Sequence, residues 1–121
     1  MTSIAIIDYG MGNLHSIAKA MEHVAGSNRV TVTSSHAEIL AADRVVFPGV
    51  GAIRDCMQEL GKTGLDDVIR EVSASKPMLG VCLGMQLLFE RSDEDGARML
   101  GLLEGDVKKI EGAPSLPHIG W

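Results

Sequence analysis

The chain has 121 residues, of which 45% are hydrophobic and only 3% aromatic, and its formal net charge is −5. This length and composition predict one globular domain with an aliphatic and methionine-based core. The acidic balance argues against a non-specific nucleic-acid binder, which needs a basic surface. No apolar run approaches the ~20 residues of a membrane span, so no membrane partner is expected.

The chain starts without the charged segment of a signal peptide and enters an apolar run almost at once. Its two cysteines, Cys56 and Cys82, are therefore expected to be free thiols of a cytoplasmic protein rather than a disulfide. No Cys/His spacing resembles a zinc site, and no cofactor is expected.

Short apolar runs and amphipathic segments alternate along the first part of the chain. Residues 3–8, 30–33 and 44–47 have the composition of buried strands. Between the first two, a helix is predicted from an N-cap at Asn13 to about residue 25. Its apolar positions recur at helical spacing and are Leu14, Ile17, Ala18, Met21 and Val24.

The same alternation continues toward the middle of the chain. Residues 35–40 predict one or two helical turns, and residues 52–60 predict a helix. A further helix is marked by four apolar positions, namely Leu65, Val68, Ile69 and Val72. Residues 78–81 then predict a strand, and residues 83–90 a helix rich in good helix formers. Strands that alternate with helices predict an α/β fold with a parallel sheet and right-handed crossovers.

The pattern changes after residue 90. Residues 91–98 are polar and charged and predict a surface loop. Residues 100–103 and 106–110 predict short antiparallel strands, and residues 112–117 a loop. We find no internal repeat and no low-complexity segment in the sequence.

The most informative stretch is Gly-Val-Cys-Leu-Gly at residues 80–84. A glycine two positions either side of a reactive side chain suits a sharp strand-to-helix turn, as around the serine of hydrolase elbows. Such a turn places Cys82 at a helix N-terminus, where the helix dipole favours a thiolate. The N–H group of Leu83 is then a candidate oxyanion donor. The competing interpretation is a buried cysteine in an ordinary turn.

Three glycine-containing turns follow predicted strands, at residues 10–12, 48–51 and 80–84. In parallel sheets, ligands bind beyond the carboxyl ends of the strands, so the three turns are expected at one edge. Two glycines around Val50 allow backbone N–H groups to form an anion-binding nest. This convergence favours the functional interpretation of Cys82, although a plain strand-terminating turn at residues 48–51 is the alternative.

Other polar residues are weighed against simpler roles. Gln86 lies about one helical turn beyond Cys82 and is a candidate for binding a polar substrate, the alternative being a half-exposed helix position. Cys56 lies inside a predicted helix and is interpreted as a packing residue. The acidic run at residues 93–95 is interpreted as solvated loop charges.

Gly10 and Gly12 after the first strand suggest a dinucleotide-binding loop. That fingerprint requires a third glycine three residues beyond the second, and His15 stands there. A tight turn or a partner-contact loop is the preferred interpretation. His15 itself is a possible base near Cys82, but a histidine in the first turn of a helix is more often exposed and idle.

Four segments together match one known family. They are Asp-Tyr-Gly-Met-Gly-Asn-Leu at 8–14, Pro-Gly-Val-Gly at 48–51, Gly-Val-Cys-Leu-Gly-Met-Gln at 80–86 and Pro-His-Ile-Gly-Trp at 117–121. The chain thereby resembles class I glutamine amidotransferases, in particular the glutaminase subunits of imidazole glycerol phosphate synthases. The resemblance implies a flavodoxin-like fold and glutamine hydrolysis. It also implies that ammonia passes to a (β/α)8-barrel cyclase subunit in histidine biosynthesis.

Carried over by residue, the resemblance makes Cys82 the nucleophile. The oxyanion hole would come from Leu83 and the backbone of Val50 and Gly51, and glutamine would be held by Gly51 and Gln86. Three residues would face the cyclase subunit, namely Asn13, His118 and Trp121.

One departure from the family is expected to matter. The family's catalytic histidine and glutamate lie in a His-Pro-Glu-like segment downstream of the elbow, and no His-x-Glu occurs in residues 83–121. We therefore expect the N-terminal part of a single glutamine amidotransferase domain, inactive alone. The alternatives are another elbow-cysteine α/β hydrolase or stress protein, or a non-catalytic partner-binding module.

Overall fold

Four apolar runs form one parallel sheet, as predicted. The structure is a computed structural model that describes residues 1–117 and 119. Its sheet strands are β1 (Ser3–Ile7), β2 (Arg29–Thr33), β3 (Arg44–Phe47) and β4 (Met78–Gly80). They are ordered β2-β1-β3-β4, and every neighbouring pair is parallel. β1 and β3 lie in the middle of the sheet and are most buried toward their carboxyl ends.

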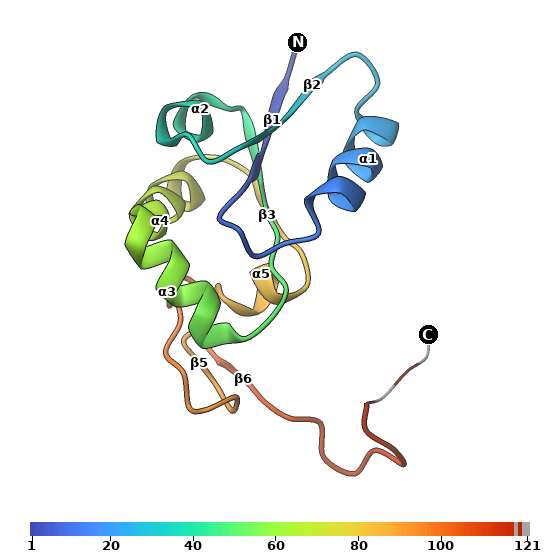
Figure 1. Ribbon diagram of the computed structural model, residues 1–121, viewed down its shortest axis with the longest axis vertical. Helices are drawn as coiled ribbons and strands as arrows, with labels where there is room; N and C mark the ends of the chain where they lie inside the picture. The colour runs from blue at the N-terminus through green and yellow to red at the C-terminus, as the bar shows by residue number, and fades with distance from the viewer. Residues whose placement is uncertain (118, 120–121) are drawn as a thin grey trace.

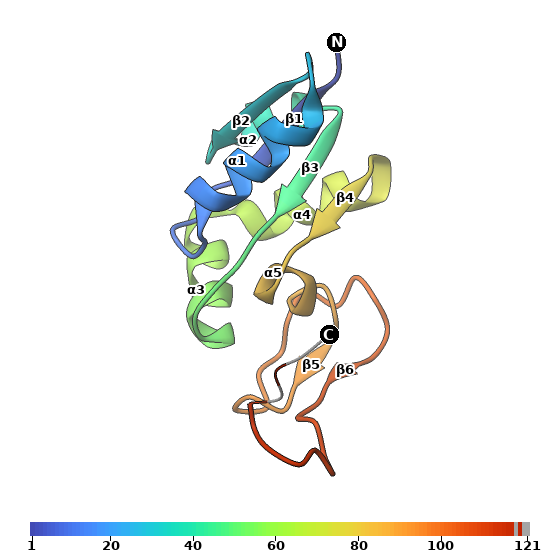
Figure 2. The same ribbon diagram turned by 90° about the vertical axis from the view of Figure 1, so that its right-hand side faces the viewer.

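Helices cover both faces of this sheet (Figure 1). α1 (Leu14–Ala25) packs beside β2 on one face. α2 (His36–Ala41) and α4 (Leu65–Ser75) contact each other and lie on the opposite face (Figure 2). α3 (Ile53–Thr63) leads into α4 and packs against it. The alternation of strands and helices along the chain therefore gives three layers, with the sheet between helices on its two faces.

The main core lies between the sheet and the helices α2, α3 and α4. It is aliphatic, as the composition predicts, and the largest fully buried side chains in it include Ile7, Ile39, Val45, Phe47, Leu60, Leu65, Ile69 and Val72. Among residues 1–117 and 119, aromatic packing is limited to Tyr9 against Phe47, whose ring centroids are 5.6 Å apart. Tyr9 and Phe47 lie next to the turns that follow β1 and β3, so the core reaches the carboxyl edge of the sheet.

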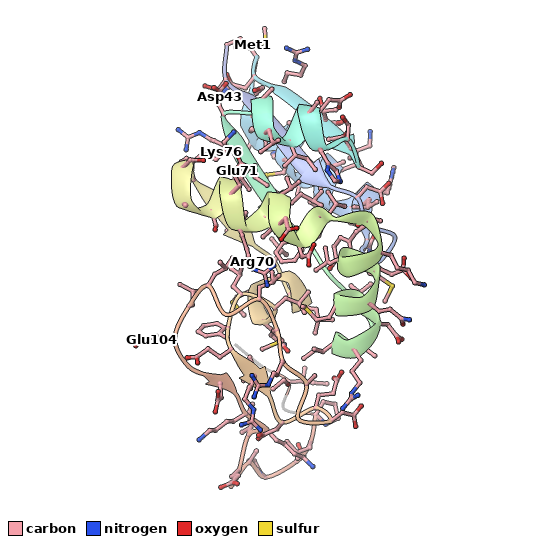
Figure 3. The ribbon with its side chains drawn as sticks, turned by 90° about the vertical axis from the view of Figure 1, so that its left-hand side faces the viewer. Met1, Asp43, Arg70, Glu71, Lys76 and Glu104 are labelled. Carbon is pink, nitrogen blue, oxygen red and sulfur yellow. The ribbon has the colours of Figure 1, made fainter. Side chains whose placement is uncertain are left out.

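The amino edge of the sheet is held by side chains that bond to backbone groups (Figure 3). Lys76, at the end of α4, donates to the carbonyl oxygens of Leu40 and Ala42. Asp43, just before β3, accepts from the backbone N–H and the hydroxyl of Ser3 on β1. These two bonds, the backbone one first, lower the pKa of the Asp43 carboxyl from its usual value.

The predicted first helix is correct in its bounds, and its apolar face is half-buried except at Val24. Val24 was expected to pack, yet it is 74% exposed, whereas Ala25 is buried. Asn13 occupies the N-cap position without a side-chain capping hydrogen bond. The predicted turn at residues 35–40 is α2, which Ser35 caps by accepting a hydrogen bond from the Glu38 N–H.

The helix after the elbow is shorter than predicted. α5 (Leu83–Gln86) has four residues, whereas helix propensity suggested residues 83–90. The carbonyl groups of Leu87, Leu88 and Phe89 accept hydrogen bonds from backbone N–H groups of residues 100–103 instead of from a continuing helix. A tertiary contact between distant segments thus overrides local propensity.

The prediction of antiparallel strands near the C-terminus is wrong. β5 (Arg91–Ser92) and β6 (Asp106–Val107) are two residues each and pair in parallel. The antiparallel contact described here is a single bridge between Arg91 and Arg98. Residues 100–103 form no strand, because their N–H groups bond to the segment after α5. Within residues 1–117 and 119, no helix is both long and apolar enough to cross a membrane.

Candidate active site

The carboxyl ends of β1, β3 and β4 bring three turns into direct contact. We call this region the carboxyl edge, and it comprises residues 8–12, 48–51 and 80–84. Val50 N–H donates to Met11 O and Leu83 N–H donates to Gly49 O, both at 3.1 Å. The turn after β3 therefore lies between the other two, and the predicted convergence of the three turns is confirmed. Figure 2 shows α5 just beyond the ends of β3 and β4.

The turn after β4 is a strained elbow. Cys82 has φ = 56° and ψ = −126°, a left-handed conformation that L residues rarely adopt. A Cβ on Gly84 would lie 2.0 Å from the Phe47 carbonyl oxygen, and one on Gly80 would lie 2.8 Å from Met85 Cα. Both flanking glycines are thus required by close backbone approach, which is the reason inferred from the sequence. Strain of this kind at a reactive side chain is typical of functional sites.

The elbow presents Cys82 to solvent. Its thiol is free and exposed, whereas Cys56 is free and buried. Cys82 is the N-cap residue of α5, but α5 has only one turn, so its dipole is weaker than that of the longer helix predicted. Access and strain, rather than a long helix, distinguish this cysteine.

The predicted oxyanion donors are both engaged in the present arrangement. The Leu83 N–H bonds to Gly49 O, and the Val50 N–H bonds to Met11 O. Gly49 C=O and Val50 N–H belong to the same peptide unit, so a rotation of that unit would break both hydrogen bonds together. The roles of Leu83 and Val50 as oxyanion donors remain predictions, and they require that peptide unit to move.

Gly51 completes the turn after β3. Its φ of +100° is unfavourable for residues with a side chain, and an added Cβ would approach Met11 Cε to 3.0 Å. Gly51 therefore keeps the turn close to the Asp8–Gly12 segment. Glycine is required at position 51 by the local backbone geometry, and the sequence motif already indicated this.

Gln86 lines a cavity of about 360 Å³ next to the elbow helix. Most of its lining residues are polar or carry charges of both signs, and besides Gln86 they are Ser92, Asp93, Glu94, Val107, Lys108 and Lys109. Gln86 is half-buried, so it is neither a packing residue nor a fully solvated one. This position matches the alternative of a half-exposed helix residue, and the role of Gln86 as a contact for a polar substrate remains a prediction.

Glu94 has a structural role that the sequence did not reveal. Its Oε2 accepts the N–H of Ile53 at the start of α3, at 2.7 Å. Glu94 had been interpreted as a solvated loop charge, because its partner lies 41 residues away and leaves no local signal. The bond ties the loop beside the cavity to the helix that follows the 48–51 turn.

Two other predicted residues lie on α1. His15 and Asn13 are exposed at the start of that helix. Among residues 1–117 and 119, no hydrogen bond joins Cys82 Sγ to a histidine or a carboxylate. His118 and Trp121, expected at a partner surface, lie outside the described residues.

Cys56 is buried in α3, as its packing role predicts. Its Sγ nevertheless lies 3.6 Å from Val50 O and donates a weak hydrogen bond to it. Tyr9, which the motif analysis passed over, donates through its hydroxyl to Pro48 O at 2.7 Å. Burial raises the pKa of both side chains, and the neighbouring Cys56 thiol adds to the shift at Tyr9.

Comparison with known proteins points to one family. The family described as "Glutamine amidotransferase class-I" matches residues 5–120. The chain is 55% identical over 130 residues to "Imidazole glycerol phosphate synthase subunit HisH" of Methylococcus capsulatus, covering 100% of this chain and 60% of the relative. It is 56% identical over 129 residues to "Imidazole glycerol phosphate synthase subunit HisH 1" of Pseudomonas aeruginosa, with the same coverage. The chain thus spans about 60% of the length of these relatives.

A solved structure supports the fold alone. A putative peptidase E protein from Listeria monocytogenes superposes with a TM-score of 0.59 at 20% identity, covering 84% of this chain and 63% of that one. The shared feature is the α/β architecture with a parallel sheet, as the sequence predicted.

We expect Gly84→Ala to destabilise the protein by about 3 kcal/mol or more, the upper end of overpacking costs. The new methyl group would collide with backbone, which cannot move aside like a flexible side chain. Gly61→Ala in α3 is the matched control, because nothing lies within 4 Å of its added Cβ. It should raise stability by roughly 0.5–1 kcal/mol. Urea unfolding measures both, and equal effects would contradict the close approach.

Cys82 should react with iodoacetamide faster than Cys56 near neutral pH. Burial raises the pKa of the Cys56 thiol, so its reactive thiolate fraction at a given pH is reduced, and its sulfur is also inaccessible. Peptide mapping after brief labelling measures both rates, and unfolding in guanidinium should bring them close together. Faster labelling of Cys56 in the folded protein would refute the assignment.

Proposed function

Because the chain belongs to the class-I glutamine amidotransferase family, we propose that it is the N-terminal part of a single glutaminase domain with Cys82 as the nucleophile. The observation that carries this proposal is the exposed thiol of Cys82 on a left-handed elbow between two glycines. The left-handed backbone at Cys82, between two closely packed glycines, holds the thiol at the carboxyl edge, where the three turns meet.

The proposed reaction proceeds through a thioester. The Cys82 sulfur attacks the side-chain carboxamide of glutamine, an S–C bond forms, and the C–N bond breaks to release ammonia. Water then hydrolyses the thioester to glutamate and restores the thiol. Proton transfer to the leaving nitrogen and from the attacking water requires a general acid–base group.

The cavity beside Gln86 supports the choice of an amino-acid substrate. Glutamine carries an ammonium and a carboxylate on its α-carbon, and the cavity offers carboxylates at Asp93 and Glu94 and ammonium groups at Lys108 and Lys109. Gly51 and Gln86 would hold the substrate near Cys82. Leu83, with the backbone of Val50 and Gly51, would stabilise the oxyanion once the 49–50 peptide unit has turned.

The names of the relatives support a narrower proposal. Ammonia from this reaction would pass to a cyclase subunit with a (β/α)8 barrel, and the resulting heterodimer would make imidazole glycerol phosphate in histidine biosynthesis. Asn13, His118 and Trp121 would face that subunit, and the exposure of Asn13 agrees with such a role. A cytoplasmic location would suit both the pathway and the two free thiols.

Gly51→Ala is expected to reduce glutamine hydrolysis by about 10²–10³-fold in the full-length protein, as the loss of one oxyanion donor does. The alanine is strained at a φ of +100° and displaces the turn. Val50→Ile is the matched control, because the Val50 side chain is 46% exposed and only its backbone is proposed to act. Glutamate release measures both variants. Mild and equal effects would show that the turn is only structural.

The 121-residue chain alone is expected not to turn over glutamine. An acid–base group is worth ~10²–10⁴ in rate, and no described residue is hydrogen-bonded to Cys82 Sγ in that role. Glutamate release by the purified chain, with and without a cyclase barrel, tests this expectation. Turnover that disappears in both Cys82→Ala and His15→Ala would instead identify His15 as the base.

A glutamine-like alkylating agent tests the proposed function separately from turnover. It should label Cys82 in the 121-residue chain, and free glutamine should protect the thiol. Binding of a cyclase barrel without such labelling would favour a non-catalytic module.

A further inference from the structure

Two buried side chains hold the 48–51 turn from the core side. Tyr9 donates its hydroxyl to Pro48 O at 2.7 Å, and the Cys56 thiol donates to Val50 O at 3.6 Å. Tyr9 comes from the turn after β1 and is 5% exposed, and Cys56 comes from α3 and is fully buried. The two side chains therefore reach the same turn from different elements of the fold.

We propose that Tyr9 and Cys56 are positioning residues that fix the two outer peptide units of the 48–51 turn, so that the middle unit alone can reorient beside Cys82. This inference rests on the proposed glutaminase function and assigns two residues to its oxyanion turn. Neither residue touches the substrate.

The hydrogen bonds divide the turn into three peptide units. Pro48 C=O belongs to the first unit and is held by Tyr9, and Val50 C=O belongs to the third and is held by Cys56. The second unit, Gly49 C=O with Val50 N–H, bonds only to the backbone of the neighbouring turns. The side-chain anchors thus flank the one unit whose two bonds must break together for the oxyanion donors to become available.

The anchors are donors over the whole neutral range of pH. Burial raises the pKa of the Tyr9 hydroxyl and of the Cys56 thiol, so both keep their protons. Deprotonation would place a negative charge against a carbonyl oxygen, and it is disfavoured in the interior. Burial therefore favours the protonated form of both side chains, in which each can donate to the turn.

The Tyr9 hydroxyl also limits what can occupy the turn. An added Cβ on Gly49 would lie 2.6 Å from Tyr9 Oη and 2.8 Å from the Gly84 backbone nitrogen. Gly49 thus lies between the Tyr9 phenol and the elbow, and there is no room for a side chain at this position. The Tyr9 ring itself is held by Phe47, at 5.6 Å between centroids. A displacement of the Tyr9 hydroxyl should therefore shift the backbone of the elbow at residues 80–84.

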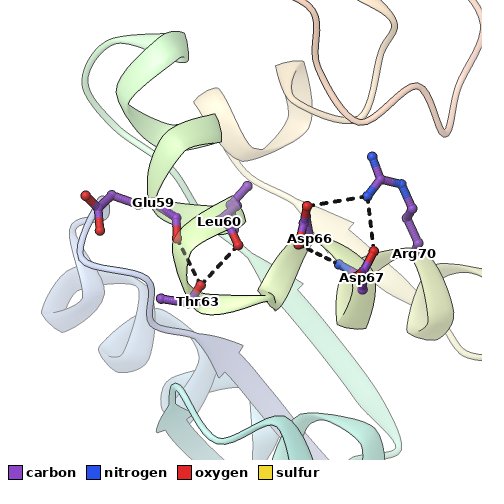
Figure 4. Close-up of polar contacts among 6 residues, drawn as sticks. All are labelled: Glu59, Leu60, Thr63, Asp66, Asp67 and Arg70. Atoms are coloured by element: carbon purple, nitrogen blue, oxygen red, sulfur yellow. Dashed lines mark hydrogen bonds and ion pairs between the residues drawn. The ribbon is translucent and has the colours of Figure 1, made fainter.

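The test removes the donors while keeping the side-chain volumes close to native. Tyr9→Phe deletes only the hydroxyl, Cys56→Ala deletes the thiol, and Cys56→Ser restores a donor at the same position. Thr63→Val is the matched control, because Thr63 lies in the same helix as Cys56 and also donates to backbone carbonyls, those of Glu59 and Leu60 (Figure 4). Its bonds lie at the opposite end of α3 from the turn.

The first readout is native-state hydrogen exchange at the amides of Val50 and Leu83, measured on this chain. Tyr9→Phe and Cys56→Ala should each speed exchange at these amides by roughly tenfold while the amides of β1 and β3 stay protected. Cys56→Ser should restore slow exchange, and Thr63→Val should leave it unchanged. Native protection at both amides in Tyr9→Phe and in Cys56→Ala would overturn the proposal.

The second readout is glutamine hydrolysis by the full-length protein. The same two variants should lower kcat by roughly ten- to a hundredfold with little change in KM, because the oxyanion donors are displaced rather than the substrate contacts. Cys56→Ser should recover most of kcat. Unchanged kcat in both variants would overturn the positioning role. An inactive wild-type protein would instead refute the glutaminase function, and the exchange data would still decide whether the two side chains hold the turn.

Discussion

The contact on which the candidate site depends is the one between Gly84 and the carbonyl oxygen of Phe47. No side chain fits there, since an added Cβ would lie 2.0 Å from that oxygen. This approach brings the first turn of α5 against the end of β3, and it places Leu83 N–H within 3.1 Å of Gly49 O. Cys82 is forced into its left-handed conformation between these constraints. The exposed thiol is therefore a consequence of backbone packing, with glycine supplying the space.

The turn after β3 makes hydrogen bonds to several different parts of the fold. Met11 O from the first turn, Leu83 N–H from the elbow, and the side chains of Tyr9 and Cys56 each take one of its polar groups. A buried polar group without a partner would be costly, so the pairing of Pro48 O, Gly49 O and both polar groups of Val50 stabilises one arrangement. The same pairing occupies the Leu83 and Val50 N–H groups, which are the proposed oxyanion donors.

Local patterns identified most of the architecture. Alternating apolar runs and helical periodicities predict the parallel sheet and its helices, because each element buries one face or both. The predictions failed where long-range contacts compete with local preference. Residues 87–90 favour a helix, but their carbonyl groups accept hydrogen bonds from the backbone N–H groups of residues 99–103. The short strands near the C-terminus pair in parallel, because the loop between them brings β6 beside β5 in the same direction. No local pattern in the sequence specifies this path of the loop.

The sequence by itself determined the elbow and the identity of its cysteine. A sharp turn needs glycine where the backbone approaches closely, and the positions of the glycines can be read from the sequence. It also marked the glycines of the 48–51 turn and the polar position of Gln86. Only the tertiary structure decided which N–H groups are occupied, that Glu94 caps α3, and that Tyr9 and Cys56 reach the turn. These contacts join residues from 6 to 41 positions apart. They arise from how the strands and helices pack, a relation that spacing along the chain does not encode.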